Sequence, residues 1–250
     1  MQDGRKPSTI FFHNDAGHSD EGKKELKTMF EQSENLFSTP KPTRLIMQLL
    51  RLCMNKNAIV LDFMAGSGTT AKAVLSQNKE DKGNRKFILV TNNENNICEN
   101  VCYPRVKNVI KGYKSSNGDE VKGFGGNLKY FKTDFVDAKP NDKNKKKLTE
   151  EATEMLCLKE DTFEEIKIKG FKNSSFRIFK NQKKYTGIIY DSLEIEDFKK
   201  AIKDIDSKFS VYVFSLSDDI FDEEFEDIRN KVKLSPIPEA IMRVYRRIFK

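Results

Sequence analysis

The chain has 250 residues, of which 33% are charged and 37% hydrophobic, and its formal net charge is +7. This length allows a sizeable core in one or two domains, while the sequence has no membrane-length apolar run and no signal-peptide core at its start. The basic balance is compatible with a polyanionic partner, and the few, widely placed cysteines suit a reducing cytoplasm.

The first part of the chain is expected to be helical on either side of a proline-rich turn. Apolar spacing predicts a helix over residues 22–30. Pro40 and Pro42 then fix an extended turn, because proline restricts both its own backbone and that of the residue before it. A second helix is predicted from there to about residue 54.

A small-residue turn after residue 61 is the stretch around which the chain is organised. An apolar strand over residues 58–61 ends at Asp62, and a helix is predicted over residues 69–77. Gly66 and Gly68 are free to take positive φ and let a ligand approach the backbone. Ligands of open α/β sheets bind at this edge, beside the free N–H groups of the helix start. An ordinary strand–helix turn is the alternative, whereas a P-loop or dinucleotide fingerprint fits the spacing poorly.

A second strand is predicted over residues 86–91, apolar enough to be central in a parallel sheet. It ends in Asn92, Asn93 and Glu94, and a helix is predicted over residues 97–111. The acid after the second strand of a nucleotide-type α/β site takes ribose hydroxyls. These polar residues could also cap the following helix, and the two roles are compatible; we expect ribose binding.

The segment after that helix is expected to be a mobile loop over residues 112–126 and then a third strand over residues 128–135. Asp134 either simply terminates this strand or offers an acceptor at its end. A charged linker over residues 138–147 is expected to separate a first domain, 1–137, from a second, 148–250.

No metal site is expected. Cys98 and Cys102 lie four residues apart on a predicted helix, but the chain has only two histidines to complete a ligand set.

The second domain is expected to be α+β and contains no catalytic constellation. The acidic stretch 218–227 is expected to be a solvated loop and helix face. The cations of the closing helix are favourable at a helix C-terminus in any case, and a DNA role for them is the less favoured interpretation. The predicted helices cover residues 148–158, 194–205 and 239–249, and the predicted strands cover 163–169, 175–180, 185–191, 209–216 and 231–235.

The string from Asp62 to Thr70 resembles the S-adenosylmethionine loop of amino-DNA methyltransferases, with Phe63 where that family usually has proline. Pro40-Lys41-Pro42, about twenty residues earlier, matches the segment that covers one side of the cofactor in that family. The residues after the second strand and the closing segment resemble one branch of type III-like modification subunits, the β-class adenine-N6 enzymes. The resemblance implies a partial Rossmann-like methyltransferase sheet followed by a smaller α+β domain.

This resemblance also implies the site. Asp62 and the glycine loop would hold the methionine part, Glu94 the ribose and Asp134 the adenine, while Phe37 and Lys41 would approach from the covering segment. The residues expected to bind the cofactor are Phe37, Thr39, Pro40, Lys41, Pro42, Asp62, Phe63, Met64, Ala65, Gly66, Ser67, Gly68, Thr69, Thr70, Asn92, Asn93, Glu94 and Asp134.

The catalytic Pro-Pro-aromatic motif of the family is absent, because the sequence has no two adjacent prolines. In the family's β arrangement this motif precedes the Pro-Lys-Pro segment, so the chain looks like the carboxyl-terminal portion of such an enzyme. We therefore expect the S-adenosylmethionine-binding portion of an adenine-N6 DNA methyltransferase of a restriction-modification system, with no catalytic residue in these 250 residues.

The expected partners are double-stranded DNA, a second copy or the upstream methyltransferase portion, and a restriction subunit, with no membrane. The alternatives are a non-catalytic cofactor-binding or partner-binding module, half of a split methyltransferase, and a methyltransferase for RNA or a small molecule.

Overall fold

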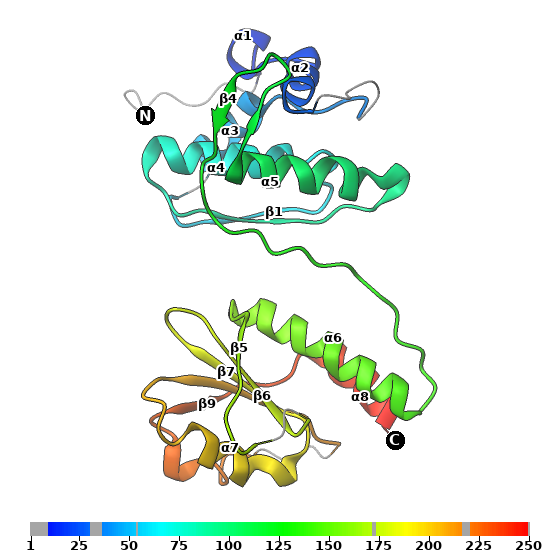
Figure 1. Cartoon of the computed structure of the whole chain (residues 1–250), viewed down its shortest axis with the longest axis vertical. Helices are drawn as coiled ribbons and strands as arrows, with labels where there is room; N and C mark the ends of the chain where they lie inside the picture. The colour runs from blue at the N-terminus through cyan, green and yellow to red at the C-terminus, as the bar shows by residue number, and fades with distance from the viewer. Residues whose placement is uncertain (1–9, 31–36, 54, 172–173, 217–220, 250) are drawn as a thin grey trace. The chain divides into compact units, whose positions relative to one another are not determined.

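The computed structural model describes residues 10–30, 37–53, 55–171, 174–216 and 221–249. The chain divides into two compact units, Met1–Lys132 and Thr133–Lys250, both drawn in Figure 1. The end of the first unit precedes the predicted linker at 138–147 by a few residues. None of the helices in the described ranges is long and apolar enough to cross a bilayer.

Three helices open the first unit: α1 (His13–Ala16), α2 (Ser19–Met29) and α3 (Thr43–Cys53). The predicted helix over 22–30 is therefore present but begins earlier, at Ser19. Helix α3 begins directly after Pro42, as predicted from the restriction that proline places on the chain. Its predicted end near residue 54 lies outside the described residues.

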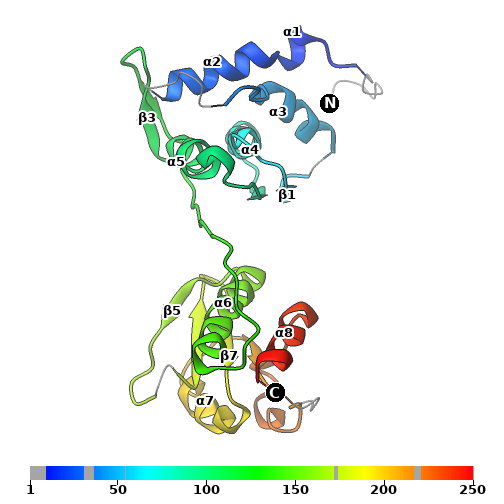
Figure 2. The same ribbon diagram turned by 90° about the vertical axis from the view of Figure 1, so that its right-hand side faces the viewer.

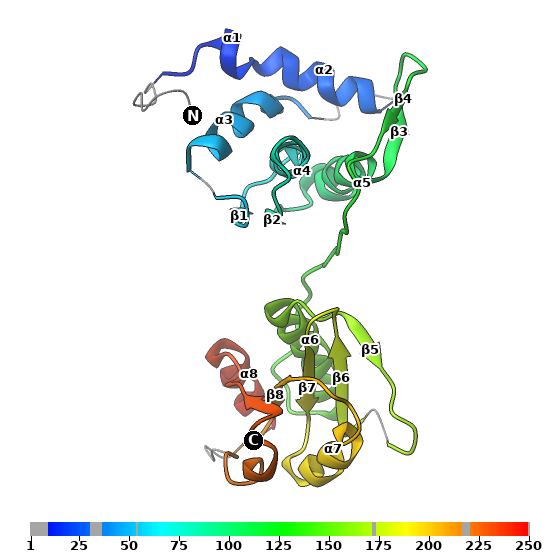
Figure 3. The same cartoon turned by 90° about the vertical axis from the view of Figure 1, so that its left-hand side faces the viewer.

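The predicted strand–loop–helix–strand sequence is confirmed. Strand β1 (Ile59–Asp62) and strand β2 (Lys86–Leu89) pair in parallel, with Val60 opposite Phe87, and α4 (Thr69–Asp81) connects them. The core between α3, α4 and β1 contains Met47, Leu50, Val60, Ala73 and Val74. Figure 3 shows α3, α4 and α5 on the same side of the two strands.

The opposite face of this strand pair is apolar and exposed. Alternation along the strands places Ile59, Leu61 and Ile88 on that face, at 63%, 60% and 44% exposure, and Val90 just beyond β2 is 51% exposed. In Figures 1 and 3 no described helix of this unit covers that side. We call these four residues the bare face.

The predicted helix over 97–111 is confirmed as one continuous helical segment, whose first part is a π-helical turn, η2 (Cys98–Cys102), and whose second part is the regular helix α5 (Tyr103–Lys111). A short 3-10 turn, η1 (Glu94–Asn96), precedes it. Asn95 and Asn96 have φ of 51° and 57°, so the chain makes a left-handed turn before it enters the helix.

The expected loop over 112–126 is wrong, because this segment forms a hairpin of β3 (Gly112–Lys114) and β4 (Glu120–Lys122). The Ser115 side chain accepts from the Asp119 N–H (3.1 Å), and the Ser115 N–H donates to the Asp119 carbonyl (2.8 Å), which closes the turn. The Ser116 N–H donates to the carbonyl of Thr28 (3.0 Å), at the end of α2. Figure 2 shows the hairpin between the ends of α5 and α2. Local composition predicted a loop because it does not reveal this contact.

The predicted third strand over 128–135 is also wrong, since residues 123–138 form no regular strand. Phe124 and Gly125 donate their N–H groups to the carbonyls of Val109 and Ile110. Tyr130 lies with its ring 5.0 Å from that of Tyr103. The segment thus contacts α5 through these two backbone hydrogen bonds and the Tyr130 ring instead of pairing as a strand.

The second unit is built on a five-stranded sheet in the order β5-β6-β7-β8-β9. Its strands fall within the predicted segments and are shorter: β5 (Glu164–Ile166), β6 (Phe176–Lys180), β7 (Tyr185–Ile189), β8 (Phe209–Val213) and β9 (Val232–Leu234). The β5–β6 and β6–β7 pairs are antiparallel, and the β7–β8 and β8–β9 pairs are parallel.

Helices cover both faces of this sheet. α6 (Asp142–Glu160) and α8 (Glu239–Phe249) share one core with the sheet, and α7 (Ile195–Ile202), which follows the short turn η3 (Ser192–Glu194), shares the other. Because α7 links the parallel neighbours β7 and β8 while β5, β6 and β7 pair antiparallel, the unit is a mixed sheet with helices on both faces.

One local expectation for this unit is corrected. Helix α6 begins inside the predicted linker, because the Asn141 side chain caps it by accepting from the Asn144 N–H (2.9 Å). Within the acidic stretch, residues 218–220 lie outside the described residues. As expected, the described acidic residues of this stretch are solvated, since Asp222, Glu223, Glu224, Glu226 and Asp227 are exposed in turns and in η4 (Glu226–Ile228). Phe225 between them is buried in the same core as α7.

Candidate functional site

The loop between β1 and α4 is shaped by Asp62. One carboxylate oxygen of Asp62 accepts from the Met64 N–H (3.1 Å), and the other accepts from the Thr70 hydroxyl (2.5 Å). The Ala65 N–H donates to the Val90 carbonyl (3.1 Å), and the Gly68 N–H donates to the Ala65 carbonyl (2.8 Å). The strand-end acid therefore holds both ends of the turn.

Both glycines of this loop have positive φ, as predicted: 51° at Gly66 and 75° at Gly68. The space beside each is filled by the chain itself. A Cβ atom on Gly66 would lie 3.1 Å from the Phe37 ring, and one on Gly68 would lie 3.0 Å from the Cys102 sulfur. Glycine is thus required here both for its backbone conformation and for close packing.

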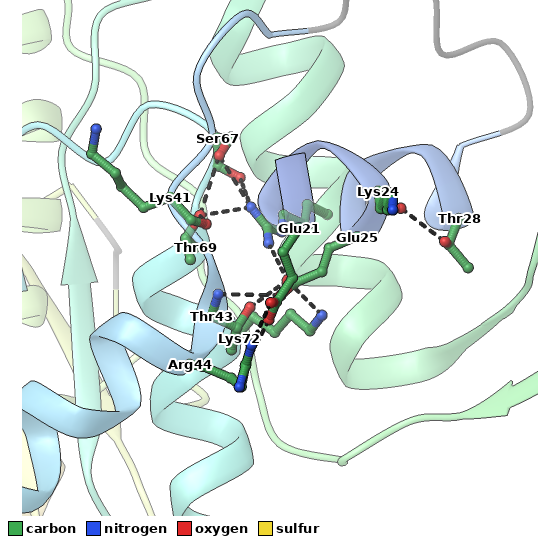
Figure 4. A network of polar contacts seen from close by, with 11 residues as sticks. Glu21, Lys24, Glu25, Thr28, Lys41, Thr43, Arg44, Ser67, Thr69 and Lys72 are labelled. Carbon is green, nitrogen blue, oxygen red and sulfur yellow. Dashed lines mark hydrogen bonds and ion pairs between the residues drawn. The ribbon is translucent and has the colours of Figure 1, made fainter. Parts of the chain in front are cut away.

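The Pro-Lys-Pro segment lies against this loop. The Lys41 carbonyl accepts from the Thr69 hydroxyl (3.2 Å), and Pro40 and Pro42 are buried. The Lys41 side chain is exposed, and Figure 4 shows it directed away from Ser67 and Thr69. The structure therefore brings together the covering segment and the glycine loop, which are separated in sequence.

The side chains of the glycine loop differ in their exposure to solvent. Ser67, Thr69 and Thr70 are buried, and the hydroxyls of Ser67 and Thr69 lie 3.3 Å apart. Phe63 and Met64 are 72% and 81% exposed. The hydroxyls are occupied within the chain, so Phe63 and Met64 are the loop side chains most open to a ligand or a partner.

The end of β2 lies beside the glycine loop, because the Val90 N–H donates to the Asp62 carbonyl (2.8 Å). Glu94 follows in η1, exposed, and accepts from the Asn92 side-chain amide (3.4 Å). Asn93 is the capping residue: its side-chain oxygen accepts from the N–H groups of Cys98 (3.1 Å) and Glu99 (3.2 Å). Capping is thus carried by Asn93, and the Glu94 carboxylate is exposed to solvent.

Asp134 belongs to the second unit and does not end a strand. Its carboxylate forms an ion pair with the Lys147 ammonium (2.6 Å), and that hydrogen bond lowers its pKa. Its predicted contact with adenine therefore rests on the family resemblance alone.

Sequence reasoning missed a buried polar network beneath the loop. Arg105 on α5 is fully buried and donates to the Ser67 carbonyl (3.3 Å), the Ser67 hydroxyl (3.0 Å) and the Thr69 hydroxyl (2.8 Å). Its other terminal nitrogen donates to Glu25 of α2 (3.2 Å). One signal was available, because Arg105 falls on the same apolar stripe as buried Val101, Cys102 and Val109. Figure 4 shows the network around Glu25.

Burial also sets the state of Cys102. Removal from water raises the pKa of its thiol from 9.0 to about 12, so the group is neutral at ordinary pH. Cys102 therefore acts as a small apolar contact below Gly68 and not as a nucleophile.

Comparison with known proteins agrees with the predicted resemblance. Residues 1–102 match the family model for DNA methylases. The chain is 49% identical over 86 residues to the StyLTI Mod subunit of a type III restriction-modification enzyme from Salmonella typhimurium, and 40% identical over 90 residues to the EcoPI Mod subunit from Escherichia phage P1. It is 45% identical over 58 residues to the type II methyltransferase M.KpnI from Klebsiella pneumoniae.

These matches cover a limited part of each protein. The aligned residues make up 34%, 36% and 23% of this chain, and 13%, 14% and 14% of the three relatives. The similarity to type III modification subunits is thereby confirmed for a minority of the chain, and the chain spans only a small fraction of those relatives.

Proposed function

We propose that the first unit is the S-adenosylmethionine-binding part of an adenine-N6 DNA methyltransferase of a restriction-modification system. The observation that carries this proposal is the contact between two segments distant in sequence: the Lys41 carbonyl and the Thr69 hydroxyl join the Pro-Lys-Pro segment to the glycine loop. Both segments lie inside the stretch that matches the DNA methylase model. The parallel β1–β2 pair would be the centre of a larger Rossmann-like sheet.

The residues at the carboxyl ends of β1 and β2 fit the parts of this cofactor. In our proposal the loop Asp62–Gly68 holds the methionine part, since its backbone is fixed by the Asp62 hydrogen bonds. The exposed Glu94 carboxylate accepts from both ribose hydroxyls. When bound, the cofactor supplies a methyl group on sulfur that the adenine amine attacks directly. The chain's contribution is to bind and orient that methyl donor.

The Pro-Pro-aromatic motif would lie on a polypeptide segment outside these 250 residues. The bare face supports this proposal, because Ile59, Leu61 and Ile88 are apolar and highly exposed. Further strands or helices from that polypeptide segment would cover them. In the complete assembly the partners would be double-stranded DNA, in line with the DNA methylase model, and a restriction subunit, in line with the restriction-modification names of the Mod-subunit relatives.

The first experiment measures binding of S-adenosylhomocysteine, the demethylated product, to the 250-residue chain by calorimetry. We expect saturable one-to-one binding, and absence of binding at millimolar ligand would contradict the proposal. The second experiment follows transfer of labelled methyl to adenine-containing duplex DNA, with and without a polypeptide that carries the Pro-Pro-aromatic motif. We expect transfer only in the mixture, and robust transfer by the chain alone would refute the assignment of the motif to another segment.

A non-catalytic binding module is the second candidate. It is favoured by the same absence of adjacent prolines from the sequence. Cofactor binding with no methyl transfer to DNA, even in the presence of the added polypeptide, would support it over the methyltransferase.

A further inference from the structure

Arg105 connects the floor of the glycine loop to α2. Its side chain is 0% exposed, and one terminal nitrogen reaches Ser67 and Thr69 while the other reaches Glu25. The guanidinium can donate to the glycine loop and to Glu25 at the same time, because its nitrogens point outward in a fixed plane. A lysine ammonium group does not have this geometry.

Glu25 is the common acceptor for three other elements. It accepts from Lys72 of α4 (2.8 Å), from the Thr43 N–H at the start of α3 (3.2 Å), and from the Thr43 hydroxyl. The directions of the Glu25, Thr43 and Lys72 side chains are visible in Figure 4. One carboxylate therefore joins helices α2, α3, α4 and α5 beneath the loop.

This arrangement is costly. A buried charge is unfavourable unless it is fully paired, and the Nε of Arg105 is buried without a hydrogen-bond partner among the described residues. A well-packed apolar side chain would serve stability alone at lower cost. The arrangement is explained if the position of the loop, and not only the stability of the fold, depends on it.

We propose that Arg105 and Glu25 are positioning residues for the cofactor loop, which they hold from the helix side while Asp62 holds it from the strand side. This inference rests on the proposed function, because it assigns the held loop to the methionine part of the cofactor. Arg105 acts through the Ser67 carbonyl and the Thr69 hydroxyl, both at the turn into α4, and has no direct contact with the ligand in this assignment.

The chain offers a matched control in Arg85. It is also buried, also pairs with a carboxylate (Asp81, 2.8 Å), and also has a buried Nε without a partner among the described residues. It lies beyond the far end of α4, away from the glycine loop. Arg105→Met and Arg85→Met therefore remove equivalent groups, and only the first removes contacts to the loop.

The test compares these two variants with the wild type by hydrogen exchange and by calorimetry. In the absence of ligand, the Ala65 and Gly68 amides should exchange about tenfold faster or more in Arg105→Met, the range expected for hydrogen bonds to a charged group. The exchange rates of these two amides should equal the wild-type rates in Arg85→Met, when the two variants are compared at the same temperature interval below their own melting temperatures. Binding of S-adenosylhomocysteine should weaken by a similar factor only in Arg105→Met.

Two further variants keep the inference testable if Arg105→Met does not fold. Arg105→Lys retains the charge opposite Glu25 but cannot reach Ser67 and Thr69 together, so its exchange rates should lie near those of Arg105→Met. Glu25→Gln should accelerate the same amides, because it removes the charge that orients Arg105. Wild-type exchange rates in Arg105→Lys, or equal rates in Arg105→Met and Arg85→Met, would overturn the inference. Failure of wild-type binding would instead overturn the proposed function and leave the exchange comparison intact.

Discussion

The sulfur of Cys102 lies where a side chain on Gly68 would have to go, 3.0 Å from the position of a Cβ atom. Gly68 is the N-cap of α4 and has φ of 75°, while Cys102 ends the π-helical turn before α5. The glycine loop and the helical segment after the second strand therefore pack closely at Gly68, next to the Arg105 contacts with Ser67 and Thr69.

Replacement of Gly68 by valine should abolish binding of S-adenosylhomocysteine. The new side chain would clash with Cys102, and valine rarely adopts positive φ. Gly118→Val is the control, because Gly118 has φ of 90° in the β3–β4 turn with no atom within 4 Å of its Cβ position. Calorimetry should show normal affinity for that variant despite its strain, and undiminished binding in Gly68→Val would refute the loop assignment.

The substitution Glu94→Gln should weaken binding of S-adenosylhomocysteine by roughly 1.5–3 kcal/mol, the range for hydrogen bonds to charged groups. The melting temperature of the Glu94→Gln variant should hardly change, because Asn93, not Glu94, caps the following turn. Asn93→Ala should show the reverse pattern, with a loss of stability of about 0.5–2 kcal/mol. Affinity and melting temperature measured on both variants separate the two roles, and a stability loss in Glu94→Gln without a change in affinity would contradict ribose binding.

Alkylation by iodoacetamide at pH 8 should spare Cys102 in the folded chain and modify the half-exposed Cys98 much faster. Burial raises the Cys102 pKa to about 12 from 9.0, so the folded chain retains a proton that the unfolded chain loses in that range. Stability from this thiol is therefore unaffected below about pH 9 and falls as pH rises from 9 toward 12. Peptide mass spectrometry checks the order of modification, and equal labelling of the two cysteines would show that the Cys102 site is open.

Substitution of Arg85 by methionine should raise the pKa of Asp81. The Arg85 hydrogen bonds hold that pKa at about 2, below the ordinary value of 3.8. A depressed carboxyl pKa stabilises the fold above pH 3.8, and this contribution is lost as pH falls from 3.8 toward 2. Carbon NMR of the Asp81 carboxyl during acid titration measures the midpoint directly, and an unchanged midpoint in the variant would show that Arg85 does not lower the Asp81 pKa.

Introduction of a charge on the bare face should reduce association of the chain. Leu61 is 60% exposed on an apolar strand, so the chain is expected to self-associate through the bare face when no other polypeptide covers it. Leu61→Glu should sediment as a monomer, whereas Leu52→Glu, at a 44% exposed position on α3, should behave like the wild type. A monomeric wild type in analytical ultracentrifugation would remove the bare face as an association site.

The sequence by itself determined the elements whose signals are local. A strand that ends in an acid, two glycines and a helix start were enough to predict β1, the loop and α4, because positive φ and helix initiation depend on neighbouring residues. The closing helix was predicted with its observed bounds, since its apolar stripe and the preceding prolines are both local.

Only the tertiary structure decided how these elements are joined. The hairpin after α5 is joined to the end of α2 by a bond between Ser116 and Thr28, and Phe124, Gly125 and Tyr130 contact α5 where a third strand was expected. The Arg105–Glu25 contact joins residues 80 positions apart. No local pattern records such pairings, because a charged residue on an apolar stripe shows that a partner is needed but not which residue the fold brings to it.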